Sequence, residues 1–422
     1  MNVRCIKMYK KIREVGEKLI KTINTYSYHS YFVGFDLNLN FFFNGPDFLG
    51  VKSNSRINSK NLLSKKEIEK LISISPKYGD KVYRTSNECI INFIKDYSNK
   101  LQKIKIGGNS VGVGETLNDL NRNVVLHIPP QIISEKTLSF LSTPLLFGLN
   151  TDLVSLNTYT SLEKLLKNWN GVMSIIFDYK KHRNIINSLW VVPFRVNEDA
   201  LHTISNLPHI AASFLSRVPT EDIPIVKKYL PHMKNRKMEL CAAEFYHNIN
   251  NDLIYNSFFS TFYSTLHDFL KFYKCENHRV TLKEIVKMLN KFLKEYLPKN
   301  EKIRFIIHSK DVEICITNVK SEKEKIVESM IAGSIIACSC AYSDRTYIKN
   351  LEKLLFEDLG YKIKISEKGK KISKNLTALN RMWKDKKYYL VSVPTILCEP
   401  ITTVGLGDAF EATEMFYRVE NF

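Results

Sequence analysis

The 422-residue sequence is poor in glycine and proline, with only 16 and 13 of them. This scarcity excludes fibrous and low-complexity proteins, whose composition depends on such residues. Hydrophobic residues make up 44% of the chain and aromatic residues 11%, so the chain can bury a substantial core and is not intrinsically disordered. A chain of this length forms one large domain or two to three ordinary ones.

Cysteine motifs and membrane segments are also missing. The eight cysteines form no C-x-x-C pair, and no H-E-x-x-H motif appears, so no ordinary zinc site is predicted. Cys338 and Cys340 lie in an apolar stretch and are expected to pack as small hydrophobic side chains. No run reaches the ~18 apolar residues of a membrane span, and the first residues lack a secretory signal. We therefore expect a reducing, cytoplasmic location with no membrane contact.

Charge of one sign is in excess. Lysine and arginine number 62 against 43 aspartates and glutamates, which gives a formal net charge of +19. Such an excess favours polyanions, phosphorylated metabolites or anionic surfaces as partners. The densest basic run, residues 362–374, is typical of a strand or hairpin with one solvated face. It lacks the aromatic residues of a stacking surface, so no nucleic-acid partner is predicted.

Hydrophobic periodicity predicts helices that alternate with strands. Helices are expected at residues 4–25, 64–75, 86–102, 111–120, 197–205, 222–233, 251–271, 281–296 and 321–343. Strands are expected at residues 30–38, 124–128, 172–178, 185–194, 236–242, 304–308 and 388–393. This alternation predicts an α/β layered fold with a mainly parallel sheet. Residues 31–43 and the hairpin at 172–194 indicate an added β layer.

Two early segments carry groups suited to a polar ligand. Alternation over residues 35–40 places Asp36, Asn38 and Asn40 on one face of an extended segment. These short polar side chains are poor strand formers and can receive hydroxyl groups, although an edge strand with a solvated face has the same pattern. Further on, Gly107, Gly108 and Asn109 precede a helix, and backbone can approach a ligand closely there; many tight turns look the same.

A Gly-x-Gly-Asp run near the C-terminus is the most specific motif in the sequence. Gly405, Leu406, Gly407 and Asp408 open a helix shortly after the last predicted strand. The glycines allow a tight turn whose N–H groups point outward, and a helix N-terminus adds partial positive charge. Together they form an anion hole suited to a phosphoryl group in transfer. Asp408 can accept the proton of an attacking hydroxyl; as an alternative, it caps the helix.

These segments resemble the ADP-dependent sugar kinases, the archaeal-type glucokinases and phosphofructokinases of the ribokinase superfamily. The similarity rests on residues 404–408 with 391–395 before them, and on weaker matches at 34–40, 106–109, 238–240, 307–309 and 331–333. The resemblance implies a ribokinase-like three-layer α/β/α core with a smaller, mostly β lid. We assign residues 1–33, 106–165 and 205–422 to the nucleotide-binding catalytic domain and residues 34–105 and 166–204 to the lid.

The resemblance also implies roles. The expected enzyme is a magnesium-dependent kinase of sugar metabolism that transfers phosphate from ADP to glucose or fructose 6-phosphate. Glu239 would organise Mg²⁺. Asp36, Asn38, Asn40 and residues 107–109 would hold the sugar, Asp408 would act as the base, and residues 405–407 would bind the phosphate.

Departures from the family pattern keep a second hypothesis open. Asp36 and Asn40 stand where the family has Asn and Asp, and Lys237 replaces the His of its His-x-Glu motif. The family's Asn-x-x-Glu magnesium motif is missing, with His267 and Asp268 as the nearest substitutes. The alternative is a non-catalytic nucleotide- or sugar-binding regulatory paralogue of the same fold.

Overall fold

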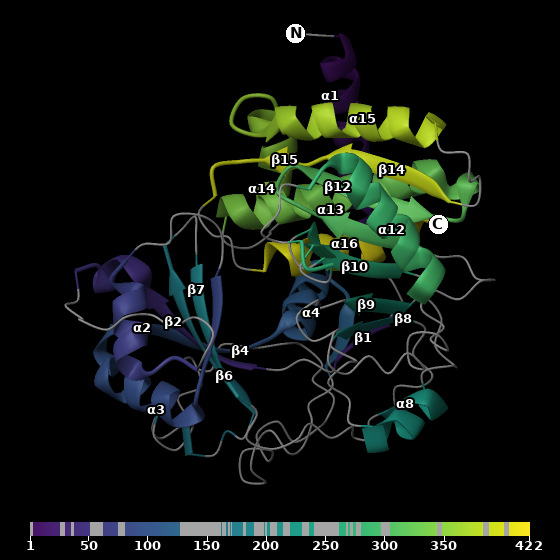
Figure 1. Ribbon diagram of the computed structural model, residues 1–422. Helices are drawn as coiled ribbons and strands as arrows, with labels where there is room; N and C mark the ends of the chain where they lie inside the picture. The colour runs from purple at the N-terminus through teal and green to yellow at the C-terminus, as the bar shows by residue number, and fades with distance from the viewer. Residues whose placement is uncertain are drawn as a thin grey trace.

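We describe the protein from a computed structural model. It describes residues 3–25, 30–34, 38–50, 62–74, 81–126, 162, 166–167, 169, 171–179, 183–189, 198, 201–202, 209–213, 220–229, 236–239, 261–266, 269–270, 273–275, 280–296, 304–343, 348–382, 388–400 and 405–422. Figure 1 shows a large α/β body joined to a smaller sheet that carries its own helices.

The large body is built on an eight-stranded sheet. Its strands, in spatial order, are β14 (Tyr389–Pro394), β12 (Val312–Thr317), β11 (Arg304–His308), β10 (Thr261–Thr265), β9 (Arg236–Glu239), β8 (His209–Ser213), β1 (Ser30–Gly34) and β5 (Asn123–Leu126). All neighbours from β11 to β5 pair in parallel, and only β12 runs antiparallel to both of its neighbours. The predicted mainly parallel sheet is therefore confirmed.

Helices cover both faces of this sheet. The helices of the large body are α1 (Val3–Asn24), α4 (Asn109–Asp119), α8 (Ile223–Tyr229), α12 (Leu282–Tyr296), α13 (Lys323–Ser343), α14 (Ile348–Lys353), α15 (Glu367–Met382) and α16 (Leu406–Asn421). On β11, Phe305 stacks on Phe292 of α12, whereas the next residue, Ile306, joins the core formed with α13 and α16. Successive strand residues point to opposite faces, so helices lie on both sides and the predicted three-layer α/β/α arrangement is confirmed.

The smaller sheet has five strands. Their order is β3 (Lys81–Thr85), β7 (Arg183–Ser188), β6 (Val172–Asp178), β2 (Asn38–Asn44) and β4 (Leu101–Gly107), with α2 (Lys65–Ile72) and α3 (Asn87–Asp96) on one face. Phe43, Phe93 of α3 and Phe177 form an aromatic cluster with ring centroids 5.5–5.9 Å apart. This cluster fills the space between the sheet and α3. All five strands lie in or next to the predicted lid, although the exact domain boundaries stay a prediction.

Three predicted elements are wrong. Residues 31–43 do not form one strand, because β1 belongs to the large sheet and β2 to the small one. The helix predicted over 251–271 contains β10, and the helix predicted to reach 102 ends at Asp96, before β4. β10 reads Thr-Phe-Tyr-Ser-Thr, and β-branched and aromatic residues between two partner strands favour the sheet.

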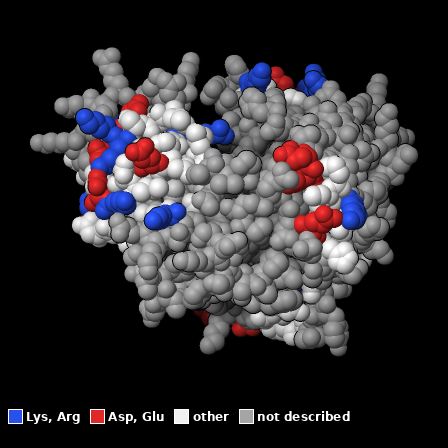
Figure 2. Space-filling model, turned by 90° about the horizontal axis from the view of Figure 1, so that it is seen from below, with Lys and Arg blue, Asp and Glu red and all other residues white. Residues whose placement is uncertain are grey.

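The basic run at residues 362–374 also differs from its predicted strand or hairpin. Only Lys364–Ile365 form a strand, β13, which pairs with β15 (Ile396–Leu397). From Glu367 the chain is α15, with Leu376 buried. On the face of the molecule in Figure 2, basic and acidic side chains of the described residues are interspersed. On that face, the charge of the described residues is therefore mixed in sign.

Helix α13 is the most apolar helix among the described residues. It is long and apolar enough to cross a membrane, but 72% of its most apolar window is buried inside the protein. It packs along α16, where Gly333 meets Phe410: a Cβ added at Gly333 would lie 2.8 Å from that ring. The helix predicted at residues 321–343 is therefore present as α13, and it is largely buried.

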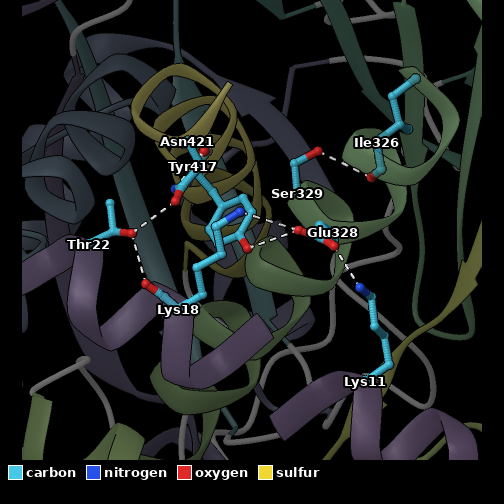
Figure 3. Close-up of polar contacts among 8 residues, drawn as sticks. All are labelled: Lys11, Lys18, Thr22, Ile326, Glu328, Ser329, Tyr417 and Asn421. Atoms are coloured by element: carbon cyan, nitrogen blue, oxygen red, sulfur yellow. Dashed lines mark hydrogen bonds and ion pairs between the residues drawn. The ribbon is translucent and has the colours of Figure 1, made fainter. Parts of the chain in front are cut away.

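A polar clasp joins the first helix to the last. Glu328 of α13 accepts from Lys11 Nζ at 2.6 Å and from the Tyr417 hydroxyl at 3.3 Å, and Lys18 Nζ lies 3.5 Å away (Figure 3). Thr22 of α1 donates to Asn421 at 3.2 Å. The clasp therefore holds α1 against α13 and the far end of α16.

We expect Glu328→Gln to destabilise the protein by about 1 kcal/mol near neutral pH, because two lysines lose their partner. Burial alone would raise the pKa of Glu328, but the hydrogen bond and charge of Lys11, with Lys18, lower the pKa below its usual 4.5. Because the pKa of Glu328 is lower in the folded state than in the unfolded chain, its charged side chain stabilises the fold at pH values above the unfolded-state pKa. This stabilisation is lost as the pH falls through the folded-state pKa. In urea unfolding, the difference between the two proteins should therefore shrink in acid below about pH 4. A difference independent of pH would contradict this assignment.

Candidate active site

The N-terminus of α16 follows a tight turn at Gly405. Gly405 adopts φ +69°, a left-handed conformation that favours glycine, and it provides no side-chain cap. Ala409 N–H bonds to the Gly405 carbonyl at 2.9 Å, which begins the helical hydrogen bonding. The N–H groups of residues 406–408 precede that bond and belong to the first turn of the helix, where N–H groups are available to a ligand. This geometry suits an anion such as a phosphoryl group.

Asp408, on the first turn of α16, lies against the first turn of α4. A Cβ added at Gly112 would lie only 2.2 Å from Asp408 Oδ2, so only glycine leaves room for this carboxylate. Helix α4 begins after Gly108, whose φ of +108° also requires glycine. Ser110 Oγ donates to the Gly34 carbonyl at 2.7 Å, which fixes α4 to the end of β1. The two glycine motifs, far apart in sequence, thus meet at one point.

A histidine–carboxylate pair lies beside the same turn. His308, the last residue of β11, has its Nε2 3.1 Å from Glu411 Oε1, and the Glu411 side chain is fully buried. A Cβ added at Gly407 would lie 2.8 Å from His308 Cε1. The His308 ring also lies 5.6 Å from that of Phe410. The ring is therefore enclosed by the first two turns of α16, and Gly407 is the second position where this turn needs a glycine.

A second buried carboxyl group lies near His308. Glu313 of β12 accepts a hydrogen bond from the Thr395 hydroxyl at 3.1 Å. Burial raises the pKa of the Glu313 carboxyl group from 4.5 to about 7. The charge of His308 and the hydrogen bonds from Thr395 and the Ser309 backbone lower this pKa, but by less than burial raises it. The folded protein therefore holds a proton on Glu313 that the unfolded chain has already lost near pH 6.

We expect Glu313→Gln to stabilise the protein by about 2 kcal/mol above pH 8, because the variant need not bury a charge. A raised folded-state pKa means that the folded protein binds more protons between pH 4.5 and about 7, so wild-type stability falls across that window as pH rises. Urea unfolding of both proteins at a series of pH values measures this. Glu367→Gln, at an exposed position on α15, is the matched control. Parallel pH profiles for wild type and Glu313→Gln would contradict the prediction.

The smaller sheet presents a polar row on the face opposite α2 and α3. In register, Asn40 of β2 pairs with Ser174 of β6, and Ser174 pairs with Asn187 of β7. Paired residues share a face of the sheet. Among the described residues, no hydrogen-bond partner reaches four buried oxygen atoms of this row: Asn38 Oδ1, Asn40 Oδ1, Ser174 Oγ and Asn187 Oδ1. Buried polar atoms are normally bonded, so this row is suited to receive ligand hydroxyl groups.

The polar row adjoins α4 and so the region of Asp408. Asn38 pairs in register with Gly107, and a Cβ added at Gly107 would overlap the Asn40 amide. Gly112 lies in the first turn of the helix that follows. Figure 1 shows α4 between the two sheets. The predicted sugar residues Asn38, Asn40 and Gly107–Asn109 thus lie together. Asp408 of α16 approaches the same region, because it contacts Gly112 in the first turn of α4.

Other predicted residues are placed less fully. Asp36, His267 and Asp268 lie outside the described residues. Glu239 is the last residue of β9, at the carboxyl edge of the parallel strands where His308 also ends β11, and only its backbone is described. Among the described residues, no group of three or more His, Cys, Asp or Glu side chains could hold a metal ion.

Sequence reasoning missed several residues of this site. Gly112 belongs to a Gly-Val-Gly run that fits no nucleotide motif, and Ser174 and Asn187 lie in a hairpin taken only as an added β layer. Alternation of polar with apolar residues along residues 183–188 is the available signal for Asn187. Glu411 had no signal, because a carboxylate on the first turns of a helix is ordinary.

Part of this chain matches a known protein family. Residues 260–417, from β10 through most of α16, match the conserved region of ADP-specific phosphofructokinases and glucokinases. No curated protein matches the chain.

Solved structures show the same fold at low sequence identity. An ADP-dependent kinase in complex with fructose 6-phosphate and ADPβS is 15% identical over 100% of this chain and 99% of its own, with a TM-score of 0.68. The last common ancestor of ADP-dependent phosphofructokinases from Methanosarcinales is also 15% identical, with coverage of 100% and 99% and a TM-score of 0.65. A hypothetical ADP-dependent phosphofructokinase from Pyrococcus horikoshii OT3 is 12% identical, with coverage of 93% and 98% and a TM-score of 0.64. The predicted resemblance and fold class are therefore confirmed.

Proposed function

We propose that this chain, which carries the conserved region of the ADP-specific phosphofructokinases and glucokinases on their fold, transfers a phosphoryl group from ADP to a sugar hydroxyl. The observation that carries the proposal is the meeting of Asp408, the uncapped turn at Gly405 and the first turn of α4. A base, an anion-binding turn and a polar face for the acceptor are the parts that this reaction needs.

In the proposed reaction, the sugar lies between the polar row of the smaller sheet and residues 107–109. Asn38 and Asn40 would accept hydrogen bonds from its hydroxyl groups, since their buried amide oxygens have no partner in the part of the chain that the structure describes. Asp408 would accept the proton of the attacking hydroxyl. The N–H groups of residues 406–408 would stabilise charge on the transferring phosphoryl group. His308 and Glu411 would hold Gly407 in place.

We also propose that the reaction requires Mg²⁺. Glu239, through water, and the nucleotide phosphates would hold the ion near the carboxyl edge of the parallel strands. When bound, it neutralises phosphate charge. We propose a cytoplasmic enzyme of sugar metabolism with no nucleic-acid or membrane partner.

Fructose 6-phosphate is the preferred acceptor in this proposal, with glucose second. Lys105 of β4 pairs in register with Asn40, so a cation adjoins the polar row. Its Nζ lies 3.6 Å from Glu115 on α4, which holds it at the junction with that helix. One of the solved structures described above holds fructose 6-phosphate, which supports the same choice.

A phosphoryl-transfer screen tests the proposal. It pairs ADP and ATP with fructose 6-phosphate, glucose, ribose and nucleosides, with magnesium present, and measures product formation. We expect turnover with ADP and fructose 6-phosphate. ADP binding by calorimetry without turnover for any pair would reject the kinase and support the non-catalytic paralogue.

Asn40→Ala should raise the KM for the sugar on the order of tenfold, because one hydroxyl loses its acceptor. The KM for ADP should stay unchanged, since Asn40 lies on the sugar side. Steady-state kinetics with each substrate varied in turn measures both constants. Asn118→Ala, an exposed position on α4, is the control. An equal rise in both constants would contradict the assignment of Asn40 to the sugar.

A further inference from the structure

Two cysteines meet on the side of α13 that faces β15. Ile396 N–H of β15 donates to Ser334 Oγ of α13 at 3.0 Å. Cys338 lies four residues after Ser334, and Cys398 lies two residues after Ile396. Four helical residues advance about 6 Å and two extended residues advance about 6.6 Å. Because these two distances are similar, Cys338 and Cys398 lie opposite each other just as Ser334 and Ile396 do.

The Cys398 thiol lies directly against Cys338. Cys398 Sγ donates to the Cys338 carbonyl at 3.6 Å. Cys338 is 4% exposed, whereas Cys398 is partly accessible. The hydrogen bond from Cys338 lowers the pKa of the Cys398 thiol, although burial opposes it, and burial and the same bond raise the pKa of Cys338. Cys398 is therefore the more reactive of the pair.

We propose that Cys338 and Cys398 are a reversible dithiol–disulfide site that reacts with small-molecule disulfides of the glutathione class and slows phosphoryl transfer when oxidised. The Cys398 thiolate attacks one sulfur of the small disulfide and releases one small thiol. Cys338 Sγ, losing its proton, then attacks Cys398 Sγ and releases the second thiol. The protein loses two electrons and two protons, which the small disulfide takes up as two thiols.

The effect on catalysis follows from what each cysteine is attached to, and this part rests on the proposed function. Cys398 lies on the segment that leads to the turn at Gly405, seven residues later. Cys338 lies on the helix whose Gly333 packs against Phe410, two residues after Asp408. A disulfide would fix the entry of the phosphate-binding turn to the helix behind it. Small displacements of catalytic groups cost large factors in rate.

The experiment exposes the reduced full-length protein to glutathione disulfide, blocks the remaining thiols and maps cross-linked peptides by mass spectrometry. We expect a cross-link between the peptides of residues 338 and 398, and a fall in kcat on the order of tenfold that dithiothreitol reverses. Cys340→Ala resolves which cysteine of α13 reacts and should keep the cross-link. Cys398→Ser should keep the basal rate and lose both the cross-link and the inhibition.

Cys275 is the matched control, since it is half-buried and its thiol contacts the Tyr273 carbonyl at 3.1 Å. Cys275→Ser should respond to the oxidant as the wild type does. No 338–398 cross-link at oxidant concentrations that modify Cys275 would overturn the proposal. So would full activity of the cross-linked protein. If no substrate pair supports turnover, the affinity for ADP is compared between the oxidised and the reduced protein in place of kcat. The thiol site is thus tested independently of the proposed reaction.

Discussion

Asp408→Asn should lower kcat by about 10³-fold, because the amide cannot accept the proton of the attacking hydroxyl. Asparagine keeps the shape of the side chain, so the contact with Gly112 and the start of α16 should persist. The KM for ADP and the KM for the sugar should therefore change little. Steady-state kinetics gives these constants, and circular dichroism checks that the fold is intact.

Asp96→Asn is the matched control for this variant. Asp96 lies at the end of α3, on the smaller sheet's outer helices, and forms an ion pair with Lys65. Its substitution should leave kcat at the wild-type value. Full activity of Asp408→Asn would sink the proposed mechanism, because no other described carboxylate lies at the first turn of α16.

Gly112→Ala should lower kcat on the order of tenfold while the helix itself becomes no less stable. The new Cβ would meet Asp408 Oδ2 at 2.2 Å, so the carboxylate must move. Displacing a catalytic group reduces the rate, whereas alanine is a better helix former than glycine by about 1 kcal/mol. The expected signature is a lower kcat with an unchanged or higher midpoint of thermal unfolding.

A double-mutant cycle distinguishes this positioning effect from general damage. If Gly112 acts through the Asp408 carboxylate, adding Gly112→Ala to Asp408→Asn should cost little further activity. Val113→Ala, at the neighbouring buried position on α4, tests the cost of ordinary core damage. Fully additive losses in the cycle would show that Gly112 affects the enzyme by another route.

The amphipathic and buried helices were predictable from local sequence. Residues 4–25, 281–296 and 321–343 show helical periodicity or long apolar stretches, and α1, α12 and α13 lie there. The Gly-x-Gly-Asp run was recognised as a turn that opens a helix, and Gly405 adopts a left-handed conformation there. In each case the information lies in one contiguous segment of the chain.

Strand β10 and the polar row were not predictable in this way. Thr261–Thr265 becomes a strand because β9 and β11 pair with it on either side, and periodicity does not report such partners. Asn40, Ser174 and Asn187 share a face because of the register of three strands, and a shift of one residue would turn each to the other face.

The fold class, the helix that begins near Asp408 and the chemistry available there could be inferred from the sequence, since backbone preferences, hydrophobic periodicity and side-chain functional groups are properties of contiguous residues. Which of these groups meet depends on the three-dimensional packing. The contacts of Gly112 with Asp408, of His308 with Gly407 and Glu411, and of Cys338 with Cys398 join segments distant in the chain. Such contacts depend on strand order and helix packing, which are set by burial of the whole core rather than by any local stretch.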